Sequence, residues 1–245
     1  MIFSLLVTSV VACTPQQLQI APTMCMPFVS DGDGMKHDPA VNDTLEISRW
    51  LAAGGRGIDT AWSYDHGGYG RSQRQMGVAI AASKLPRADL FVTTKIPCGD
   101  NASAVAALIE YDLQQLMLPF VDLLLIHTPS NCKTAAALAE TWAAMEGALA
   151  KKQVRAIGVS NFKQANLDAL MKTAKVKPAV NQIAFSVGVL DSSTIAASAA
   201  LGITVEAYSP LGHTGAPVMK NAVVVATAKA LGKSAAQVAL RYIYC

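Results

Sequence analysis

A repeated alternation between short apolar runs and longer amphipathic segments constrains this chain more than any other feature. From Asp43 onward, each β-rich run is followed by a polar loop and then by a stretch with apolar residues at helical spacing. The run Val121–Ile126 is apolar at nearly every position, as is typical of a strand buried on both faces of a parallel sheet. The alternation therefore predicts βα units joined by right-handed crossovers, in an α/β fold.

The predicted strands approach the number found in a closed barrel. Met26–Ser30 is a candidate first strand, after a hairpin around Gln17–Cys25, and the later strands are expected at residues 57–60, 90–94, 121–126, 154–159, 179–183 and 203–207. We expect helices near residues 41–53, 70–83, 102–117, 134–151, 163–173, 192–201, 219–231 and 234–243. Together these elements predict a (β/α)8 TIM-type barrel that lacks its eighth strand and C-terminal loop.

A doubly wound open sheet would show the same alternation of strands and helices. Such a sheet usually has a Gly-x-Gly-x-x-Gly turn where the first helix after a strand begins. The nearest candidate here, Gly67-Gly68-Tyr69-Gly70, has the wrong spacing. The sequence therefore favours the barrel.

Composition argues against several classes of protein. Hydrophobic residues make up 52% of the chain and charged residues 15%, and no uninterrupted apolar run approaches the roughly 20 residues of a transmembrane helix. A net charge of +3 without a long Lys/Arg run gives no electrostatic footprint for nucleic acid. A length of 245 residues suits one barrel domain, which we expect over residues 16–245.

The first residues have the character of a targeting segment. Ile2–Ala12 is apolar and ends in small residues before Cys13, which fits the hydrophobic core and cleavage site of a secretory signal, although a basic start is missing. Val10–Cys13 also fits a bacterial lipoprotein box. We therefore treat residues 1–15 as a candidate signal segment that indicates export; without it, the expected location is the cytoplasm.

The cysteine pattern indicates neither a disulfide framework nor a metal site. The chain has five, Cys13, Cys25, Cys98, Cys132 and Cys245, an odd number at wide spacings without a Cys-x-x-Cys pair. Neither disulfides nor a zinc site follow from that pattern, so we expect free thiols and no bound metal.

Three ionisable residues stand at the ends of consecutive predicted strands. Asp59 follows the apolar part of the strand expected at 57–60, Lys95 ends the run Leu90–Lys95, and His127 follows Val121–Ile126. Because the C-terminal ends of barrel strands open onto one rim, we expect these side chains to converge there. Tyr64, in the loop after Asp59, can fold over the same rim.

These residue types have a joint chemical purpose. A tyrosine with an ordinary pKa near 10 is a poor acid or base at neutral pH, but a nearby ammonium such as that of Lys95 favours its phenolate. Asp59 would keep the lysine charged and oriented. A neutral His127 could donate a hydrogen bond to a carbonyl oxygen as that oxygen gains negative charge. The set predicts a proton-donating site for carbonyl reduction.

Three segments around these residues resemble the signature regions that carry the catalytic tetrad of the aldo-keto reductases. They are Ile58–Tyr64, Leu90–Lys95 and Val121–His127. The resemblance covers about residues 40–243 in the family's order and continues through Val154–Phe162, Pro178–Gln182, Val205–Gly212 and Gly232–Arg241.

The resemblance implies a barrel that binds a nicotinamide cofactor across its strand ends and reduces an aldehyde or ketone. The usual cofactor is NADPH, and NADH is not excluded. By similarity, Tyr64 is the proton donor, Lys95 and Asp59 tune it, and His127 orients the substrate carbonyl. The remaining implied contacts are Ser160, Asn161 and Gln182 with the carboxamide, Tyr208 against the nicotinamide ring, Ser209 and Leu211 along the pyrophosphate, and Trp62 as a wall of the substrate pocket or as rim packing.

Two departures from the family pattern bear on cofactor binding. Where the family has a Gly-x-Gly-Thr-like turn, this chain reads Ser30-Asp31-Gly32-Asp33-Gly34, and carboxylates there would repel a pyrophosphate. The chain also stops at Cys245, before the expected eighth strand and the segment that grips the 2'-phosphate. An incomplete barrel edge predicts self-association. The alternative to a reductase is a non-catalytic relative that acts as a cofactor-sensing or interaction module.

Overall fold

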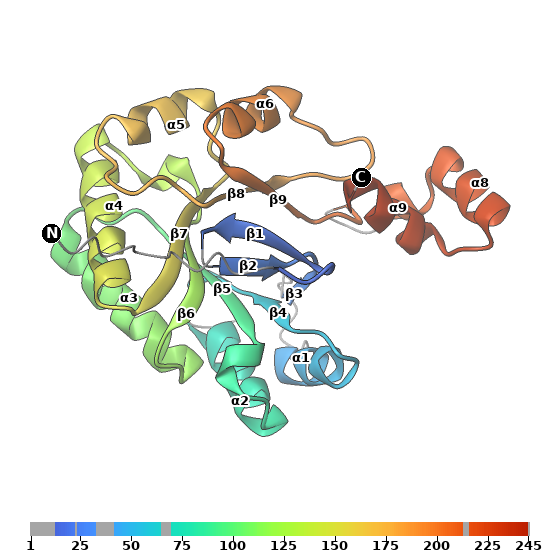
Figure 1. The fold of residues 1–245 in the computed structure, drawn as a ribbon, viewed down its shortest axis with the longest axis horizontal. Coiled ribbons are helices and arrows are strands. Elements are labelled where there is room, and N and C mark those ends of the chain that lie inside the picture. The colour runs from blue at the N-terminus through green and yellow to red at the C-terminus, as the bar shows by residue number, and fades with distance from the viewer. Residues whose placement is uncertain (1–12, 23, 33–41, 65–69, 213–215, 245) are drawn as a thin grey trace, which may run out of the picture.

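A parallel sheet of seven strands, curled into an incomplete barrel, forms the centre of the molecule (Figure 1). This is a computed structural model, and it describes residues 13–22, 24–32, 42–64, 70–212 and 216–244. The strands follow one another in chain order: β3 (Ser30–Gly32), β4 (Gly57–Asp59), β5 (Phe91–Ile96), β6 (Val121–Ile126), β7 (Val154–Ser160), β8 (Val180–Ala184) and β9 (Thr204–Tyr208). The predicted α/β barrel architecture is confirmed, with β3 and β9 at the two edges of the sheet.

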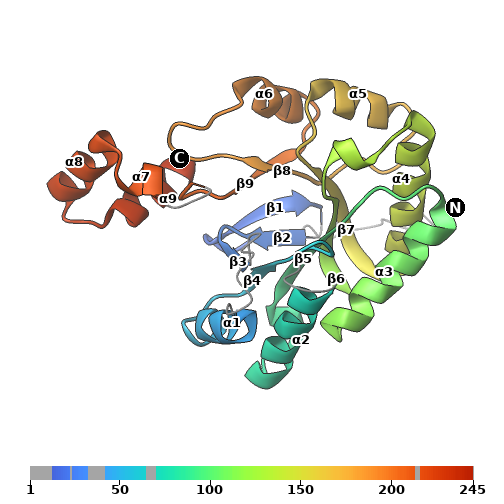
Figure 2. The ribbon, with the colours of Figure 1, turned by 180° about the vertical axis from the view of Figure 1, so that it is seen from behind.

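The helices up to residue 200 cover the convex side of the sheet, whereas those after residue 215 project beyond it at one side, as Figures 1 and 2 show. The helices are α1 (Asp43–Ala52), α2 (Arg71–Ser83), α3 (Ala102–Leu116), α4 (Ala135–Ala150), α5 (Gln164–Met171), α6 (Ser192–Ala200), α7 (Ala216–Met219), α8 (Ala222–Leu231) and α9 (Ala235–Tyr244), with short 3-10 turns at Arg87–Asp89 and Pro129–Asn131. Side-chain caps begin several of them: the oxygen of Asn101 accepts the backbone N–H of Ala104 at 2.9 Å. Asn221 caps α8 in the same way, so the helix expected at 219–231 begins at Ala222.

Side-chain alternation along the strands sorts the apolar residues into two layers. Val92 and Ile96 of β5 pack outward in the cluster shared with the helices. Phe91 of the same strand, with Leu123 and Leu125 of β6, packs inward in a second cluster. Because successive residues of a strand face opposite sides, Thr93 and Lys95 also face inward, above Phe91. The core inside the curl is therefore apolar at one end and polar at the other.

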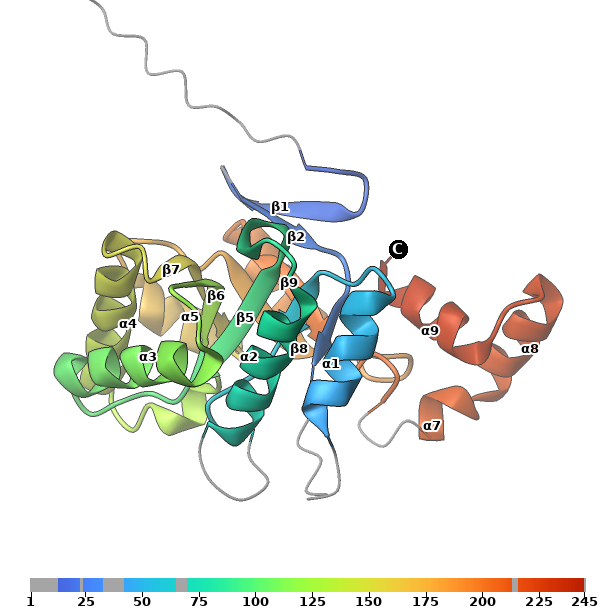
Figure 3. The ribbon, with the colours of Figure 1, turned by 90° about the horizontal axis from the view of Figure 1, so that it is seen from below.

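A two-stranded hairpin lies at the end of the barrel where the strands begin (Figure 3). It consists of β1 (Gln17–Ala21) and β2 (Met24–Pro27), which pair antiparallel. Ile20, Met24 and Met26 of this hairpin pack into the inner apolar cluster. The hairpin was predicted, but the first barrel strand was expected at Met26–Ser30 and lies at Ser30–Gly32 instead. Met26 is taken by the hairpin because its side chain completes the floor of the inner core.

The candidate signal segment lies largely outside the described residues, since these begin at Cys13. Asp33 lies outside them too, whereas Asp31 pairs in register with Ile58, whose side chain packs outward. No single helix in the described ranges is long and apolar enough to cross a bilayer; α8 and α9 meet that test only together, across a bend of 103°.

Candidate active site

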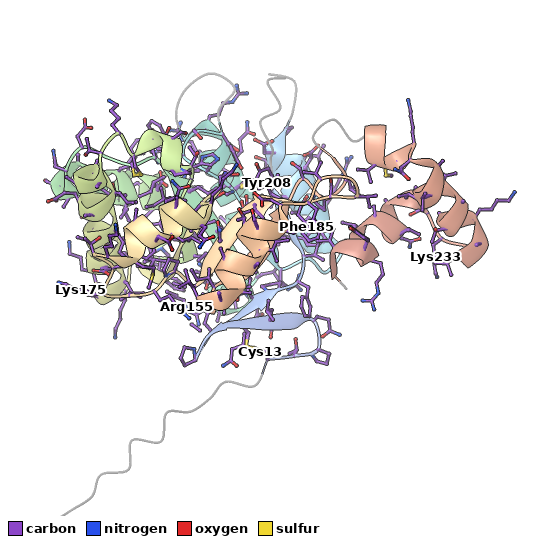
Figure 4. The ribbon with its side chains drawn as sticks, turned by 90° about the horizontal axis from the view of Figure 1, so that it is seen from above. Cys13, Arg155, Lys175, Phe185, Tyr208 and Lys233 are labelled. Carbon is purple, nitrogen blue, oxygen red and sulfur yellow. A yellow bond between two sulfur atoms is a disulfide. The ribbon has the colours of Figure 1, made fainter. Side chains whose placement is uncertain are left out.

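The C-terminal strand ends form the polar end of the barrel, opposite the hairpin. In Figure 4, Tyr208 at the end of β9 and Arg155 near the start of β7 mark the two ends, and Cys13 lies beyond Arg155. Asp59 ends β4, Lys95 is the fifth residue of β5, and His127 follows β6. The strand ends therefore bring the predicted residues to one rim.

Lys95 is the centre of this rim. Its side chain is 1% exposed and its ammonium forms an ion pair with Oδ1 of Asp59. The same Nζ donates to the hydroxyl oxygen of Tyr64 at 3.3 Å and to the carbonyl oxygen of Thr60 at 3.2 Å. Burial alone would lower the pKa of Lys95. The charges of Asp59, Tyr64 and Glu206 and the hydrogen bond to Asp59 together outweigh burial, so the pKa lies above its usual value. Lys95 is therefore a charged donor aimed at the Tyr64 oxygen.

His127 stands edge-on to Tyr64. The ring centroids are 5.4 Å apart with the planes at 81°, and the backbone N–H of His127 donates to the carbonyl of Ile96 at 2.8 Å. Nδ1 lies 3.0 Å from the hydroxyl oxygen of Ser63. Burial, reinforced by the charge of Lys95, lowers the pKa of His127 to about 4. The imidazole is consequently neutral at physiological pH.

Asn161 joins His127 to the strands on the other side of the rim. Its amide nitrogen donates to the carbonyl oxygen of His127 and to Oγ of Ser160, both at 3.0 Å. Its amide oxygen accepts from the hydroxyl of Tyr208 at 3.0 Å, and its backbone N–H donates to the carbonyl of Gln182 at 2.8 Å. Asn161 adopts φ of 62°, a left-handed conformation that asparagine tolerates better than most residues. The ring of Tyr208 is thereby held in place by its hydroxyl.

Three further predicted residues lie in turns after the strands. Ser209 and Leu211 follow β9 in a tight turn closed by a hydrogen bond of 2.8 Å from the N–H of Gly212 to the carbonyl of Ser209. Trp62 follows β4, and its backbone N–H donates to the carbonyl of Lys95 at 2.9 Å. All three side chains are partly exposed at the rim, where a ligand could reach them.

Gln182 reveals a member of the site that the sequence reasoning missed. Its amide nitrogen donates to Oδ2 of Asp59 and to Oε2 of Glu206, each at 2.8 Å. Burial, reinforced by the charge of Asp59, raises the pKa of Glu206 to about 7, against the Gln182 hydrogen bond and the charge of Lys95. The sequence could have indicated Glu206, because it lies two residues before Tyr208 on β9 and side-chain alternation puts both on the same face of the strand.

Two disulfides correct the expectation of free thiols. Cys98, after β5, is bonded to Cys132, after β6, with Cα atoms 5.0 Å apart. Cys13 is bonded to Cys25 in the hairpin, with Cα atoms 5.5 Å apart. Wide spacing along the chain misled the prediction, because consecutive βα units bring residues 34 positions apart to neighbouring strand ends. Among the described residues, no group of three or more His, Cys, Asp or Glu side chains could hold a metal ion.

Comparison with known proteins finds consistent matches. The sequence profile described as Aldo/keto reductase family matches residues 29–245. The 9,11-endoperoxide prostaglandin H2 reductase of Trypanosoma cruzi is 36% identical over 203 residues, which are 82% of this chain and 68% of that protein. Glyoxal reductase of Bacillus subtilis is 35% identical over 200 residues, with 81% and 68% covered.

Solved structures agree. The Bombyx mori aldo-keto reductase in complex with NADP superposes with a TM-score of 0.81 at 30% identity, covering 94% of this chain and 80% of that one. An aldo/keto reductase from Brucella melitensis has a TM-score of 0.82 at 29% identity, covering 92% and 83%.

Proposed function

This chain belongs to the aldo/keto reductase family, and on that premise we propose that it reduces an aldehyde or ketone to an alcohol with NADPH. The observation that carries the proposal is the contact of 3.3 Å between the Lys95 ammonium and the Tyr64 hydroxyl, beside a neutral His127. Such a set can hold a carbonyl oxygen and give it a proton. The preference for NADPH over NADH is supported by the NADP complex of the silkworm relative.

The residues at the rim suit a nicotinamide. Tyr208 offers a ring fixed through its hydroxyl, and the amide oxygen of Gln182 accepts no hydrogen bond from the described residues. A flat ring that carries an amide can stack on the ring of Tyr208, and its amide N–H can donate to the oxygen of Gln182. Ser160, Asn161, Gln182 and Tyr208 would hold the nicotinamide, and Ser209 and Leu211 would lie along the pyrophosphate. When bound, the cofactor supplies the hydride.

The protein side of the reaction is proton transfer from Tyr64 to the carbonyl oxygen. As the Tyr64 oxygen loses its proton it becomes negative, and the ammonium of Lys95 stabilises that charge in a buried site. The hydroxyl oxygen of Ser63 lies 3.0 Å from Nδ1 of His127, and in the tautomer in which this hydroxyl donates, the single imidazole proton is on Nε2. His127 can then donate to the substrate oxygen and orient it. Trp62 would wall the pocket.

Cofactor titration tests the proposal. Nicotinamide fluorescence is followed while the purified protein is titrated with NADPH and with NADH, and an aromatic aldehyde is then added. We expect tighter binding of NADPH and turnover of the aldehyde. Lack of binding of either cofactor at millimolar concentration would reject the enzyme, whereas binding without turnover of any carbonyl would favour the non-catalytic alternative.

The proton donor is tested with Tyr64→Phe. We expect this variant to lose most of the turnover and to bind NADPH nearly as well as the wild type. Tyr242→Phe is the matched control, because Tyr242 is 48% exposed on α9 and lies outside the site. Full activity in Tyr64→Phe would reject Tyr64 as the donor.

We further propose that the chain acquires its disulfides in an oxidising compartment, after export. The two disulfides support this, since such bonds form mainly outside the cytosol. Alkylation of the unreduced protein followed by mass spectrometry should find Cys13, Cys25, Cys98 and Cys132 blocked. Labelling of these four in freshly isolated protein would contradict the proposal.

Self-association through the open edges of β3 and β9 is likewise a proposal. Unpaired strand edges can pair with another chain. Light scattering over a tenfold range of concentration should show a mass that rises with concentration, and a constant monomer mass would contradict it.

A further inference from the structure

We propose that Glu206 is a positioning residue: with Asp59 it holds the amide nitrogen of Gln182 inside the barrel, so that the amide oxygen of Gln182 is left for the carboxamide of a bound nicotinamide. The inference rests on the proposed function and assigns Glu206 a part in it. Glu206 itself would touch neither cofactor nor substrate.

The polarity of the contacts determines how the Gln182 amide is oriented. Ionised carboxylate oxygens only accept hydrogen bonds, so the atom at 2.8 Å from both Asp59 and Glu206 must be the amide nitrogen. Both of its N–H groups are then used. The oxygen of Gln182 is the part of the amide that remains for a ligand, and it can only accept.

The fold explains why two carboxylates meet at one amide. Gln182 and Glu206 are in register on the adjacent strands β8 and β9, and their side chains face the interior together. Asp59 comes from β4, 123 positions before Gln182, and reaches the same amide because the sheet curls. The bridge therefore spans the barrel and links the Lys95–Asp59 pair to the strand that carries Tyr208.

The charge of Glu206 sets the strength of the bridge. Asp59 from β4 and Lys95 from β5 act on it electrostatically, and Tyr208 lies two residues farther along β9. Burial raises the pKa of Glu206 to about 7, so its carboxyl is protonated at acid pH and ionised at alkaline pH. A hydrogen bond to an ionised acceptor is roughly twice as strong as a neutral one. We therefore expect the hold on Gln182 to tighten as pH rises through 7.

The first test needs no cofactor. In the NMR spectrum of the 15N-labelled protein, the side-chain amide signal of Gln182 is assigned by its loss in Gln182→Met and followed from pH 5.5 to 8.5. We expect a midpoint near 7 in the wild type and none in Glu206→Gln, whose amide oxygen can still accept from Gln182 but cannot ionise. The control is Glu110→Gln, an exposed site on α3. A Gln182 signal that does not titrate in the wild type would overturn the bridge.

The second test measures NADPH dissociation constants by fluorescence at pH 6 and pH 8.5. Glu206→Leu removes the acceptor, and we expect NADPH to bind about 3- to 10-fold more weakly at pH 8.5, as loss of one oriented hydrogen bond implies. We expect KM for NADPH to rise in step while kcat changes less. In Glu206→Gln the pH dependence of binding should be smaller than in the wild type and in Glu110→Gln.

The outcomes separate the two proposals. Wild-type binding that is unchanged in Glu206→Leu overturns the role of Glu206 and leaves the reductase standing. A wild-type protein without affinity for either cofactor overturns the reductase and the ligand assigned to Gln182, whatever the NMR titration shows. Circular dichroism and thermal unfolding of Glu206→Leu establish that a loss of binding does not reflect unfolding.

Discussion

The ammonium of Lys95 lies 3.3 Å from the hydroxyl oxygen of Tyr64, in the interior of the curled sheet. The two residues are 31 positions apart and come from different βα units. The ion pair with Asp59 keeps this ammonium charged in spite of its burial. The contact joins the most buried charge at the rim to the proposed proton donor.

Replacing Lys95 should therefore impair proton transfer more than folding. Lys95→Met leaves Asp59 without its partner, so the variant to measure is Lys95→Met with Asp59→Asn. We expect kcat to fall by about 10²- to 10⁴-fold, the range for loss of acid-base assistance. Thermal unfolding monitors the fold. Activity within a few fold of the wild type would contradict the assigned role of Lys95.

His127 should remain neutral over the working pH range. Its pKa is lowered to about 4, below that of an unfolded histidine, so the unfolded state binds more protons between pH 4 and about 6.5. Stability should rise with pH across that window and be fully present above it. NMR titration of the His127 ring should show a midpoint near 4. A midpoint above 6 would contradict a neutral donor.

Gly32 should tolerate no side chain. A Cβ at this position would lie 3.1 Å from the Cβ of Asp59 and closer still to its carbonyl oxygen. We expect Gly32→Ala to displace Asp59, to lower activity at least tenfold and to cost about 1–3 kcal/mol of stability, as overpacking does. Gly147→Ala on α4, where a Cβ meets nothing within 4 Å, should stabilise the protein by about 0.4–1 kcal/mol. Equal changes in the free energy of unfolding for Gly32→Ala and Gly147→Ala would refute the prediction for Gly32.

Asp112 should make the protein less stable as pH rises. Burial raises its pKa to about 7, although hydrogen bonds from Gln73 and Thr94 oppose the shift. Between pH 4 and 7 the folded state keeps a proton that the unfolded state has lost, so stability falls across this window and the penalty is complete above it. Asp112→Asn should remove the penalty and be more stable at pH 8 by about 1–3 kcal/mol.

Urea unfolding at pH 5 and pH 8 measures this difference. Asp168→Asn, at an exposed position on α5, is the matched control and should follow the wild type. A wild-type stability that rises from pH 5 to pH 8 as steeply as that of Asp112→Asn would exclude a destabilising Asp112 carboxylate.

The disulfide between Cys98 and Cys132 should stabilise the rim. It closes a loop of 34 positions that contains His127, and loops of that size contribute about 2–4 kcal/mol. Cys98→Ser with Cys132→Ser should lose that amount in denaturant unfolding. The control is Cys13→Ser with Cys25→Ser, which opens a loop of 12 positions in the hairpin. This control should change KM for the carbonyl substrate less than the loss of the Cys98–Cys132 bond at the rim does.

The barrel and the identities of its rim residues were open to prediction because they depend on local pattern. Strand interiors such as Val121–Ile126 are apolar on both faces, and a polar residue at the end of such a run marks the rim. Lys95 and His127 stand at those ends, and the structure places both there. The hairpin was also visible, but its boundary was not, because Met26 is apolar in either strand and only its packing decides.

Local periodicity specified six of the seven strands of the sheet and the face on which their polar side chains lie, because these depend on neighbours in the chain. The curl of the sheet decided the rest. It carries Asp59 to an amide 123 positions away, sets Glu206 beside it, and brings Cys98 to Cys132. Hydrophobic periodicity does not indicate contacts between distant strands, since these contacts depend on how far the whole sheet closes.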